Sequence, residues 1–368
     1  MTKRLIAFSI TLMSLALLTG PKVAPCCMWF TLAATDGSIM VSRTMEFGVP
    51  LNYKIVVSPR NMSFQSQAPN GKTGLSWKTR YGFVGYYGAG PEGAVADGMN
   101  EVGLTVGGLW FEPNTKYQEV KTGEESKALS LVLTGPWILG NFSTVDEVRR
   151  ELRNVVIFGD FVKELNMVPP LHFAVSDATG KMIVIEYEDG KLNIYDAPLG
   201  ILTNAPKFPW HMTNLRQYIG MTNSTPARGV LDNEKLYPTG HGSGMFGVPG
   251  DMTPPSRFVR LALVVKSVER QPDVEKNLNL AQHIVNSFDI SKGLIIEKAR
   301  DGKVTNSETT QFATFKDLTN RVMYQRTYEN LEVTKIDLKK LDFGGNKFNY
   351  IPFSPNPQTY SDITDQAQ

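Results

Sequence analysis

The sequence predicts a single layered α+β domain. Strand-like patterns fill the first half of the chain, helical patterns follow, and strands return near the C-terminus, an order typical of segregated α and β layers. With 42% hydrophobic and 20% charged residues, the composition is that of an ordinary globular protein. No repeat, low-complexity tract or linker rich in Pro, Gly or Ser divides the 368 residues, so one continuous domain is favoured over two small ones.

The first 26 residues have the form of a secretory signal peptide. Lys3 and Arg4 precede an apolar run from Leu5 to Leu18, which ends before the helix breakers Gly20 and Pro21. At about 14 residues the run is shorter than the ~20 that a membrane-spanning helix needs. A transmembrane anchor is therefore the weaker interpretation, and we expect a periplasmic or secreted protein without an integral membrane span.

The cleavage site determines which residue begins the mature chain. Ala24-Pro25-Cys26 fits a small-x-small site with the cut before Cys27, which leaves residues 27–368 as one domain. Because proline is unusual in such a triplet, an earlier cut followed by trimming is an alternative. Lipidation of Cys26 or Cys27 is another, although the residues that precede both cysteines fit a lipoprotein signal poorly.

Strands are expected first along the mature chain. Strand-like runs cover Trp29–Ala34, Ser38–Met45 and Gly103–Trp110. An Asp-Gly pair between the first two indicates a hairpin. Residues 171–198 hold three alternating runs separated by the turn sequences DATGK and EDGK, which is the clearest β signal in the chain.

Helices are expected in three places. Ser143–Asn154 begins with a Ser/Thr cap and acids three residues later, Ser256–Arg270 places apolar residues on one face, and Glu275–Phe288 follows. Strands return within Phe312–Thr327. The tail from about residue 352, rich in Pro, Gln and Ser, is interpreted as a surface arm, with disorder as the alternative.

Charge and histidine spacing exclude several classes of function. Removal of Lys3, Arg4 and Lys22 with the signal leaves 35 basic and 36 acidic residues, a net charge of about −1 that does not suggest nucleic acid as a partner. None of the four histidines, His172, His211, His241 and His283, has a metal-ligand spacing, and the mature chain has one cysteine, so no metal site is expected.

The glycine-rich segment YPTGHGSGMFGVPGD lacks the Gly-Lys-Ser/Thr ending of a phosphate-binding loop. It is interpreted as a mobile loop, and a role in gating a substrate site is compatible with that.

The two adjacent cysteines point to a specific chemistry. Cleavage before Cys27 would put a lone thiol and a free α-amino group on the same residue. An α-amine with a pKa near ~8 can act as the base for its own side chain, as in N-terminal-nucleophile hydrolases. The expected hairpin brings Arg43 and Glu46 near this terminus, where an arginine can raise the thiolate fraction and a carboxylate can position the nucleophile. A surface ion pair on an edge strand is the structural alternative.

Four blocks in order resemble the choloylglycine hydrolase family, which includes bile salt hydrolases and penicillin V acylases. They are Cys27 with Asp36-Gly37 and the Arg43-Thr44-Met45-Glu46 motif, DGMNEVGLTVGGLWF at 97–111, LHFAVSDATGKMIVIEY to LTNAP at 171–206, and PGDMTPPSRFVR at 249–260. The resemblance runs from Cys27 to the C-terminal region. It implies a four-layer αββα N-terminal-nucleophile fold with two stacked, mainly antiparallel sheets between helix layers.

The resemblance also implies roles for individual residues. Cys27 matches the nucleophile, Arg43 the arginine beside the thiol, and Asn204 the side-chain donor to the oxyanion. Arg257 matches the arginine that supports charge around the thiol and the amine. Glu46 stands where the family normally has Asp. Trp110 occupies a substrate-binding position where bile salt hydrolases have Asn and many penicillin V acylases have Tyr, and its backbone N–H would complete the oxyanion hole.

The expected reaction is hydrolysis of a small-molecule linear amide between an apolar acyl chain and a small polar amine, without cofactor or metal. The aromatic side chain of Trp110 favours penicillin V acylase-like substrates, with bile salts or N-acyl homoserine lactones as alternatives. Trp110 as an ordinary core residue also remains open. The non-enzyme alternatives are a lipid-anchored envelope protein and a ligand-binding protein on a hydrolase-like fold. By resemblance, a homotetramer is expected.

Overall fold

The computed structural model describes residues 26–51, 53–88, 90–299, 301–353 and 357–367. The predicted signal peptide, apart from Cys26, lies outside the described residues.

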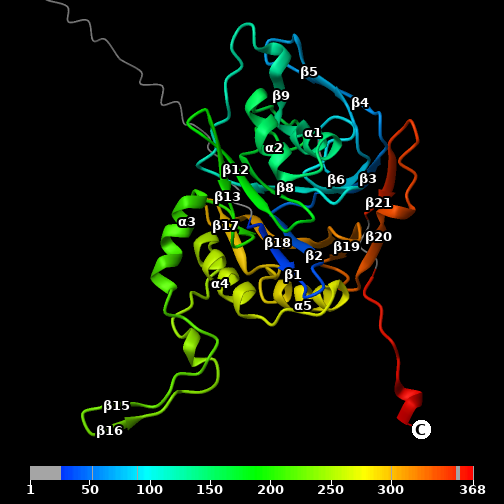
Figure 1. Ribbon diagram of the computed structural model, residues 1–368. Helices are drawn as coiled ribbons and strands as arrows, with labels where there is room; N and C mark the ends of the chain where they lie inside the picture. The colour runs from blue at the N-terminus through cyan, green and yellow to red at the C-terminus, as the bar shows by residue number, and fades with distance from the viewer. Residues whose placement is uncertain (1–25, 52, 89, 300, 354–356, 368) are drawn as a thin grey trace, which may run out of the picture.

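Two antiparallel sheets lie face to face and are covered on their outer faces by helices (Figure 1). The seven-stranded sheet has the order β14 (Ile201–Leu202), β1 (Met28–Ala33), β2 (Ile39–Phe47), β18 (Val304–Asp317), β19 (Val322–Thr327) and β20 (Thr334–Asp337), with β17 (Ile295–Lys298) also paired to β18. The eight-stranded sheet has the order β13 (Lys191–Asp196), β12 (Met182–Glu188), β11 (Leu171–Ser176), β8 (Thr105–Trp110), β7 (Asp97–Asn100), β6 (Phe83–Tyr87), β3 (Lys54–Ser58) and β21 (Asn349–Pro352).

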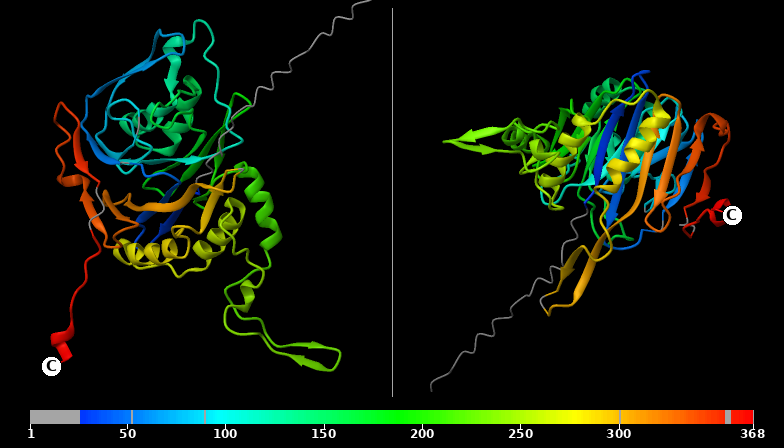
Figure 2. Two further views of the ribbon diagram at one scale, coloured as in Figure 1. Left: turned by 180° about the vertical axis from the view of Figure 1, so that it is seen from behind. Right: turned by 90° about the horizontal axis from the view of Figure 1, so that it is seen from below.

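Helices form the two outer layers, which makes the architecture αββα. Helices α1 (Thr134–Asn141) and α2 (Val145–Glu151) cover the eight-stranded sheet, and α4 (Pro254–Ser267) and α5 (Val274–Asn286) cover the seven-stranded sheet (Figure 2). Helix α3 (Phe208–Leu215) packs beside α4. Three small ribbons complete the fold: β4 (Ser63–Gln67) with β5 (Thr73–Lys78), β9 (Ala128–Ser130) with β10 (Val156–Phe158), and β15 (Gly229–Leu231) with β16 (Glu234–Leu236).

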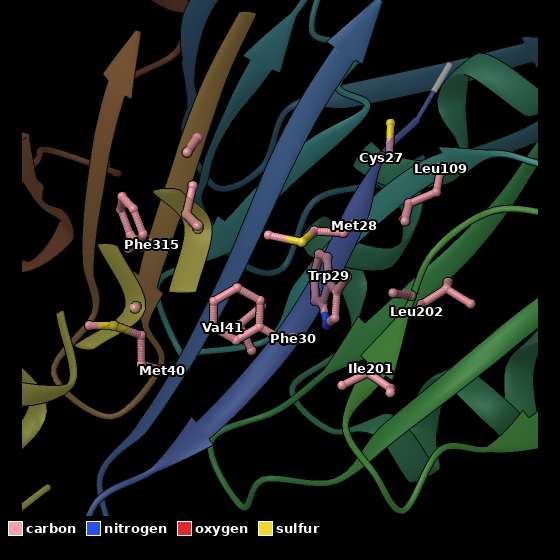
Figure 3. Close-up of a cluster of buried hydrophobic side chains, with 14 of the residues drawn as sticks. Cys27, Met28, Trp29, Phe30, Met40, Val41, Leu109, Ile201, Leu202 and Phe315 are labelled. Atoms are coloured by element: carbon pink, nitrogen blue, oxygen red, sulfur yellow. The ribbon is translucent and has the colours of Figure 1, made fainter. Parts of the chain in front are cut away.

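The space between the sheets is a densely packed core. All nine residues of β2 are buried, because helices cover one face of its sheet and the second sheet covers the other. Figure 3 shows β1 and its neighbours in this core, with Trp29 and Phe30 on the strand and Cys27 at its beginning. The Trp29 ring packs against Gly107 of β8, where an added Cβ would lie 2.5 Å from the ring. The missing side chain therefore lets the two sheets approach closely beside the nucleophile position.

The expected strands and helices are present, with shifted ends. Helix α2 is shorter than predicted because it ends at Glu151 and continues as a 3₁₀ turn, and its capping box is formed by Thr144 and Glu147. Helix α4 begins two residues earlier than predicted, at Pro254, where proline is well tolerated. Helix α1 was not predicted, because its sequence TGPWILGN contains glycine and proline and resembles a turn.

Two segments extend from the layered body. Residues 219–248, with the ribbon β15–β16, form an arm that runs away from α3 and α4, and residues 357–367 lie outside the layered body on the opposite side (Figure 1). Between Gly240 and Gly250 the chain forms a 3₁₀ turn at Ser243–Met245. Within the described ranges, no helix combines the length and apolar character needed to cross a membrane.

Candidate active site

Cys27 lies directly before β1, at the edge of the space between the sheets. The antiparallel hairpin of β1 and β2 pairs Met28 with Thr44 and Trp29 with Arg43, so the Arg43–Glu46 motif runs beside the start of β1 as predicted. The Cys27 side chain is only 3% exposed. Both sheets therefore contribute to the surroundings of its thiol.

Arg43 connects the thiol to the second sheet. Its Nη2 lies 3.8 Å from Cys27 Sγ and donates to the carbonyl of Gly108 on β8 at 2.6 Å. The Nη1 atom lies 3.6 Å from a carboxylate oxygen of Asp97 on β7. Burial raises the pKa of the Cys27 thiol, whereas the positive charge of Arg43 opposes that shift by favouring the thiolate.

Asp97 and Lys316 form a second buried ion pair behind Arg43. The Lys316 ammonium on β18 bonds to Asp97 and lies 4.5 Å from the centre of the Trp29 ring, and neither charged side chain is exposed. Burial lowers the pKa of Lys316 to about 8, with Asp97 opposing the shift. Arg43 and Lys316 thus share the single carboxylate of Asp97 near the thiol, which leaves one excess positive charge. The negative charge of an ionised Cys27 would neutralise it. Sequence reasoning gave no role to Asp97 or Lys316.

Glu46 reaches the site through its backbone as well as its side chain. A backbone hydrogen bond from Glu46 to the Cys27 thiol favours the thiolate. The carboxyl group accepts hydrogen bonds from Thr310 at 2.8 Å and Thr44 at 3.0 Å. Burial raises the pKa of Glu46 to about 8, against the positive charge of Arg257 and the two threonine bonds.

Arg257 connects Cys27 to Asn204. From the first turn of α4, its Nη1 donates to the Cys27 carbonyl and its Nη2 donates to Asn204 Oδ1, both at 2.7 Å. Because the guanidinium only donates, Oδ1 must face Arg257. The Asn204 Nδ2 then points toward β8, where it donates to the carbonyl of Trp110 at 2.9 Å. The Asn204 amide is therefore fixed between α4 and the end of β8.

An apolar pocket opens beside the thiol. Trp110 is 4% exposed and meets the ring of Phe47 edge-on, with 5.8 Å between ring centres. The lining combines the candidate residues Cys27, Arg43, Glu46 and Trp110 with mainly apolar side chains from β2, the segment before β3, the segment before α1, the β10–β11 loop and β11. They include Met45, Tyr53, Leu131, Val132, Leu165 and Phe173. Such a lining suits an apolar acyl group attached to a carbonyl at Cys27.

The structure thus brings together all six residues singled out from the sequence. A family model described as linear amide C–N hydrolases, choloylglycine hydrolase family, matches residues 27–352. This chain belongs to the choloylglycine hydrolase family. The match begins at the residue predicted to be the nucleophile.

Relatives of this family span almost the whole chain. A bile salt hydrolase/transferase of Clostridium perfringens is 32% identical, over 87% of this chain and 95% of its own length. A penicillin V acylase of Pectobacterium atrosepticum is 24% identical, over 87% of this chain and 83% of its own. As a member of this family, the chain is a hydrolase of linear, non-peptide C–N amide bonds.

Solved structures confirm the predicted N-terminal-nucleophile fold. A variant of conjugated bile acid hydrolase from Clostridium perfringens superposes with a TM-score of 0.79 at 30% identity, covering 92% of this chain and all of the other. Penicillin V acylase from Agrobacterium tumefaciens has a TM-score of 0.70 at 22% identity, covering 90% and 95%, and this likeness concerns the fold alone. In the part of the chain that the structure describes, no group of His, Cys, Asp and Glu side chains could hold a metal ion.

Proposed function

We propose that the mature chain begins at Cys27 and hydrolyses conjugated bile salts, which are amides between a bulky apolar acyl group and a small polar amine. The observation that carries this proposal is the 32% identity over 95% of a bile salt hydrolase/transferase, against 24% for a penicillin V acylase. These identities reverse the order of preference that Trp110 suggested from the sequence.

The geometry supports a thioester mechanism. The Cys27 thiol passes its proton to the α-amine, directly or through water, and the resulting thiolate, stabilised by Arg43 at 3.8 Å, attacks the substrate carbonyl. Asn204 Nδ2 and the Trp110 backbone N–H are the proposed donors to the oxyanion, and one such donor is typically worth ~10²–10³ in rate. The α-ammonium then protonates the leaving nitrogen, the C–N bond breaks and the amine product departs. Water, which gives a proton to the α-amine, attacks the thioester; the C–S bond breaks, the acid is released and the Cys27 thiol is regenerated.

A second substrate class is favoured by one feature of the pocket. The edge-on pair of Trp110 and Phe47 forms an aromatic wall near the thiol. Such a wall suits an aryl group held close to the scissile carbonyl, as in the phenoxyacetyl amide of penicillin V. The same pocket is open to the acyl chain of an N-acyl homoserine lactone.

A substrate panel tests these alternatives. Glycine- and taurine-conjugated bile salts, penicillin V and an N-acyl homoserine lactone would be compared by kcat/KM, with Cys27→Ser as the control. We expect a conjugated bile salt to exceed penicillin V by at least about tenfold, and every activity to be lost in Cys27→Ser. A preference for penicillin V would replace the bile-salt assignment, whereas activity that survives in Cys27→Ser would overturn the nucleophile.

We further propose that the enzyme is exported and forms a homo-oligomer. The arm 219–248 exposes large apolar side chains, with Ile219 at 85% and Phe246 at 89%, which supports its burial against other copies of the chain. Fractionation should find the mature enzyme in the periplasm or medium. Light scattering should give a tetramer that Ile219→Ser with Phe246→Ser dissociates, and a monomeric wild type would contradict the assembly.

A further inference from the structure

The turn that carries Asn204 is held by two buried histidines. Asn204 follows β14 in the segment Leu202-Thr203-Asn204-Ala205-Pro206. His211 Nε2 from α3 lies 2.8 Å from the Asn204 carbonyl oxygen, and His172 Nε2 from β11 lies 3.2 Å from the Thr203 carbonyl oxygen. Both imidazoles are fully buried. Two histidines from different elements thus bind consecutive carbonyls of the same turn.

The hydrogen-bond partners determine the protonation of these rings. A backbone carbonyl can only accept, so Nε2 of each histidine must carry the proton. Both rings are stacked on aromatic neighbours, His172 on Phe111 at 4.5 Å and His211 on Phe258 at 4.6 Å between ring centres. Burial lowers the pKa of His172 to about 3 and that of His211 to about 4, so both are neutral donors at physiological pH.

Glu186 completes the chain of contacts behind His172. Its Oε1 lies 3.1 Å from His172 Nδ1, and both carboxyl oxygens accept from the backbone N–H of Phe208, the first residue of α3. Since Nε2 of His172 carries a proton, one more proton must lie between Nδ1 and Oε1. Burial raises the pKa of Glu186 to about 9, which favours a neutral carboxylic acid that donates to Nδ1.

We propose that His211 and His172, supported by neutral Glu186, are positioning residues that fix the backbone of the Asn204 turn and thereby aim the Asn204 amide at the oxyanion. Neither histidine lines the pocket beside Cys27. They act through Asn204, whose side chain is held independently by Arg257 and the Trp110 carbonyl. The proposal rests on the proposed function, because it assumes that Asn204 stabilises the oxyanion.

The position of the oxyanion donor matters as well as its presence. An oxyanion donor stabilises the transition state only within about 2.7–3.1 Å of the developing charge, and loss of one donor costs about 10²–10³ in kcat. Release of the Asn204 carbonyl would let the turn shift while the amide remains in the site. We therefore expect a smaller loss of kcat than complete removal of the donor would cause, with substrate binding nearly unchanged.

Substitutions of His211 test the inference on whichever amide the wild type hydrolyses. His211→Leu removes the donor, whereas His211→Gln keeps an amide N–H near the position of Nε2. We expect kcat to fall about 10–100-fold in His211→Leu with KM within about twofold, and His211→Gln to recover to within about fivefold of wild type. The exposed His283 on α5 offers a matched control, His283→Leu, which should leave both constants unchanged.

The rate of Cys27 alkylation by iodoacetamide distinguishes a displaced Asn204 amide from a general disturbance of the active site. This rate reports the thiol and not the oxyanion donor, so it should stay within about twofold of wild type in every His211 variant. If His211→Leu does not fold, His211→Asn, whose amide is too short to reach the carbonyl, replaces it. Equal losses in the Leu and Gln variants, an unchanged kcat, or a parallel fall in alkylation would overturn the inference. A wild type that hydrolyses no amide would overturn the proposed function and this inference with it.

Discussion

The two sides of the Cys27 site are held by different kinds of interaction. On the thiol side, Arg43 is fixed by buried charges, with Asp97 and Lys316 stacked behind it in the core between the sheets. On the oxyanion side, the Thr203–Asn204 turn is fixed by neutral donors from His172 and His211, and Arg257 provides the single charge that reaches across to Cys27. Both sides meet at the same residue.

In the proposed mechanism the two sides have different tasks, and these account for the difference. The thiol has to become an anion, and a buried anion requires nearby positive charge, because burial alone raises its pKa. The oxyanion donor has to be placed within tenths of an ångström, and hydrogen bonds from neutral histidines to the turn can hold it there without adding charge. Substitutions on the thiol side should therefore alter thiol ionisation, whereas those on the oxyanion side should alter kcat at constant thiol reactivity.

The largest effect is expected where the two sides meet. Cys27→Ser keeps the shape of the site but replaces the thiolate with a far weaker nucleophile, so kcat/KM should fall by about 10⁴-fold or more. Unfolding by urea, compared between the variant and wild type, serves as the control and should be nearly unchanged. A variant that retains a tenth of the wild-type activity would remove Cys27 from the mechanism.

The charged side should be the more fragile of the two. Asp97→Asn leaves Arg43 and Lys316 buried without their shared anion, and breaking a buried ion pair in this way typically costs about 3–5 kcal/mol of the free energy of unfolding. Urea denaturation measures this loss. The double variant with Lys316→Met removes one unpaired cation and should be more stable than Asp97→Asn alone; if it is less stable, the charge argument is wrong.

On the oxyanion side, a neutral Glu186 should make the free energy of unfolding depend on pH. The pKa of Glu186 is about 9 in the folded chain against an ordinary value of 4.5, so the folded state keeps a proton that the unfolded state loses. This stabilisation is fully present below about pH 4.5 and is lost as the pH rises through about 9. Glu186→Gln, which keeps a neutral donor to His172, should therefore lose less stability than wild type between about pH 5 and pH 8.

The expected difference between the two changes in the free energy of unfolding is at most about 4 kcal/mol over that interval. Urea unfolding of both proteins at the two pH values measures it. Identical slopes would show that Glu186 is ionised in the folded chain, in which case the second proton lies on His172 and the oxyanion side is charged as well.

The smallest effect is expected from Lys316→Met. Removing this cation weakens the positive potential near Cys27 while Asp97 can still pair with Arg43, so alkylation of the thiol should slow by a few-fold near neutral pH. Lys335→Met, at an exposed position on strand β20 of the same sheet, is the matched control. Equal alkylation rates in wild type and Lys316→Met would show that Lys316 does not influence ionisation of the Cys27 thiol and that Arg43 alone supplies the positive charge.

Local patterns predicted the residues that lie close together in sequence. The Asp-Gly turn and two alternating runs predict the β1–β2 hairpin, and the hairpin alone brings Arg43 and Glu46 beside Cys27. Asn204 and Arg257 approach Cys27 from β14 and α4, more than 170 residues away, and no periodicity predicts that contact. They were identified through the family motifs.

The residues that support the site from behind, Lys316, His172 and His211, are harder to recognise from the sequence. Lys316 stands in the stretch FATFKDL, which has four apolar residues in seven, and a lysine at an inward-facing strand position is a sign of a buried partner. His172 and His211 were considered only as metal ligands, although histidines in apolar runs also serve as buried donors. Their targets are backbone carbonyls, which no side-chain pattern reveals.

The N-terminal-nucleophile mechanism requires a specific chemical state of Cys27 in the mature enzyme. The decisive measurement is the intact mass and N-terminal sequence of active protein purified from the producing cells. We predict a chain that starts at unmodified Cys27, with 342 residues, a free α-amine and a free thiol. A chain that begins elsewhere, or a diacylglyceryl group on either cysteine, would contradict the N-terminal-nucleophile mechanism proposed here.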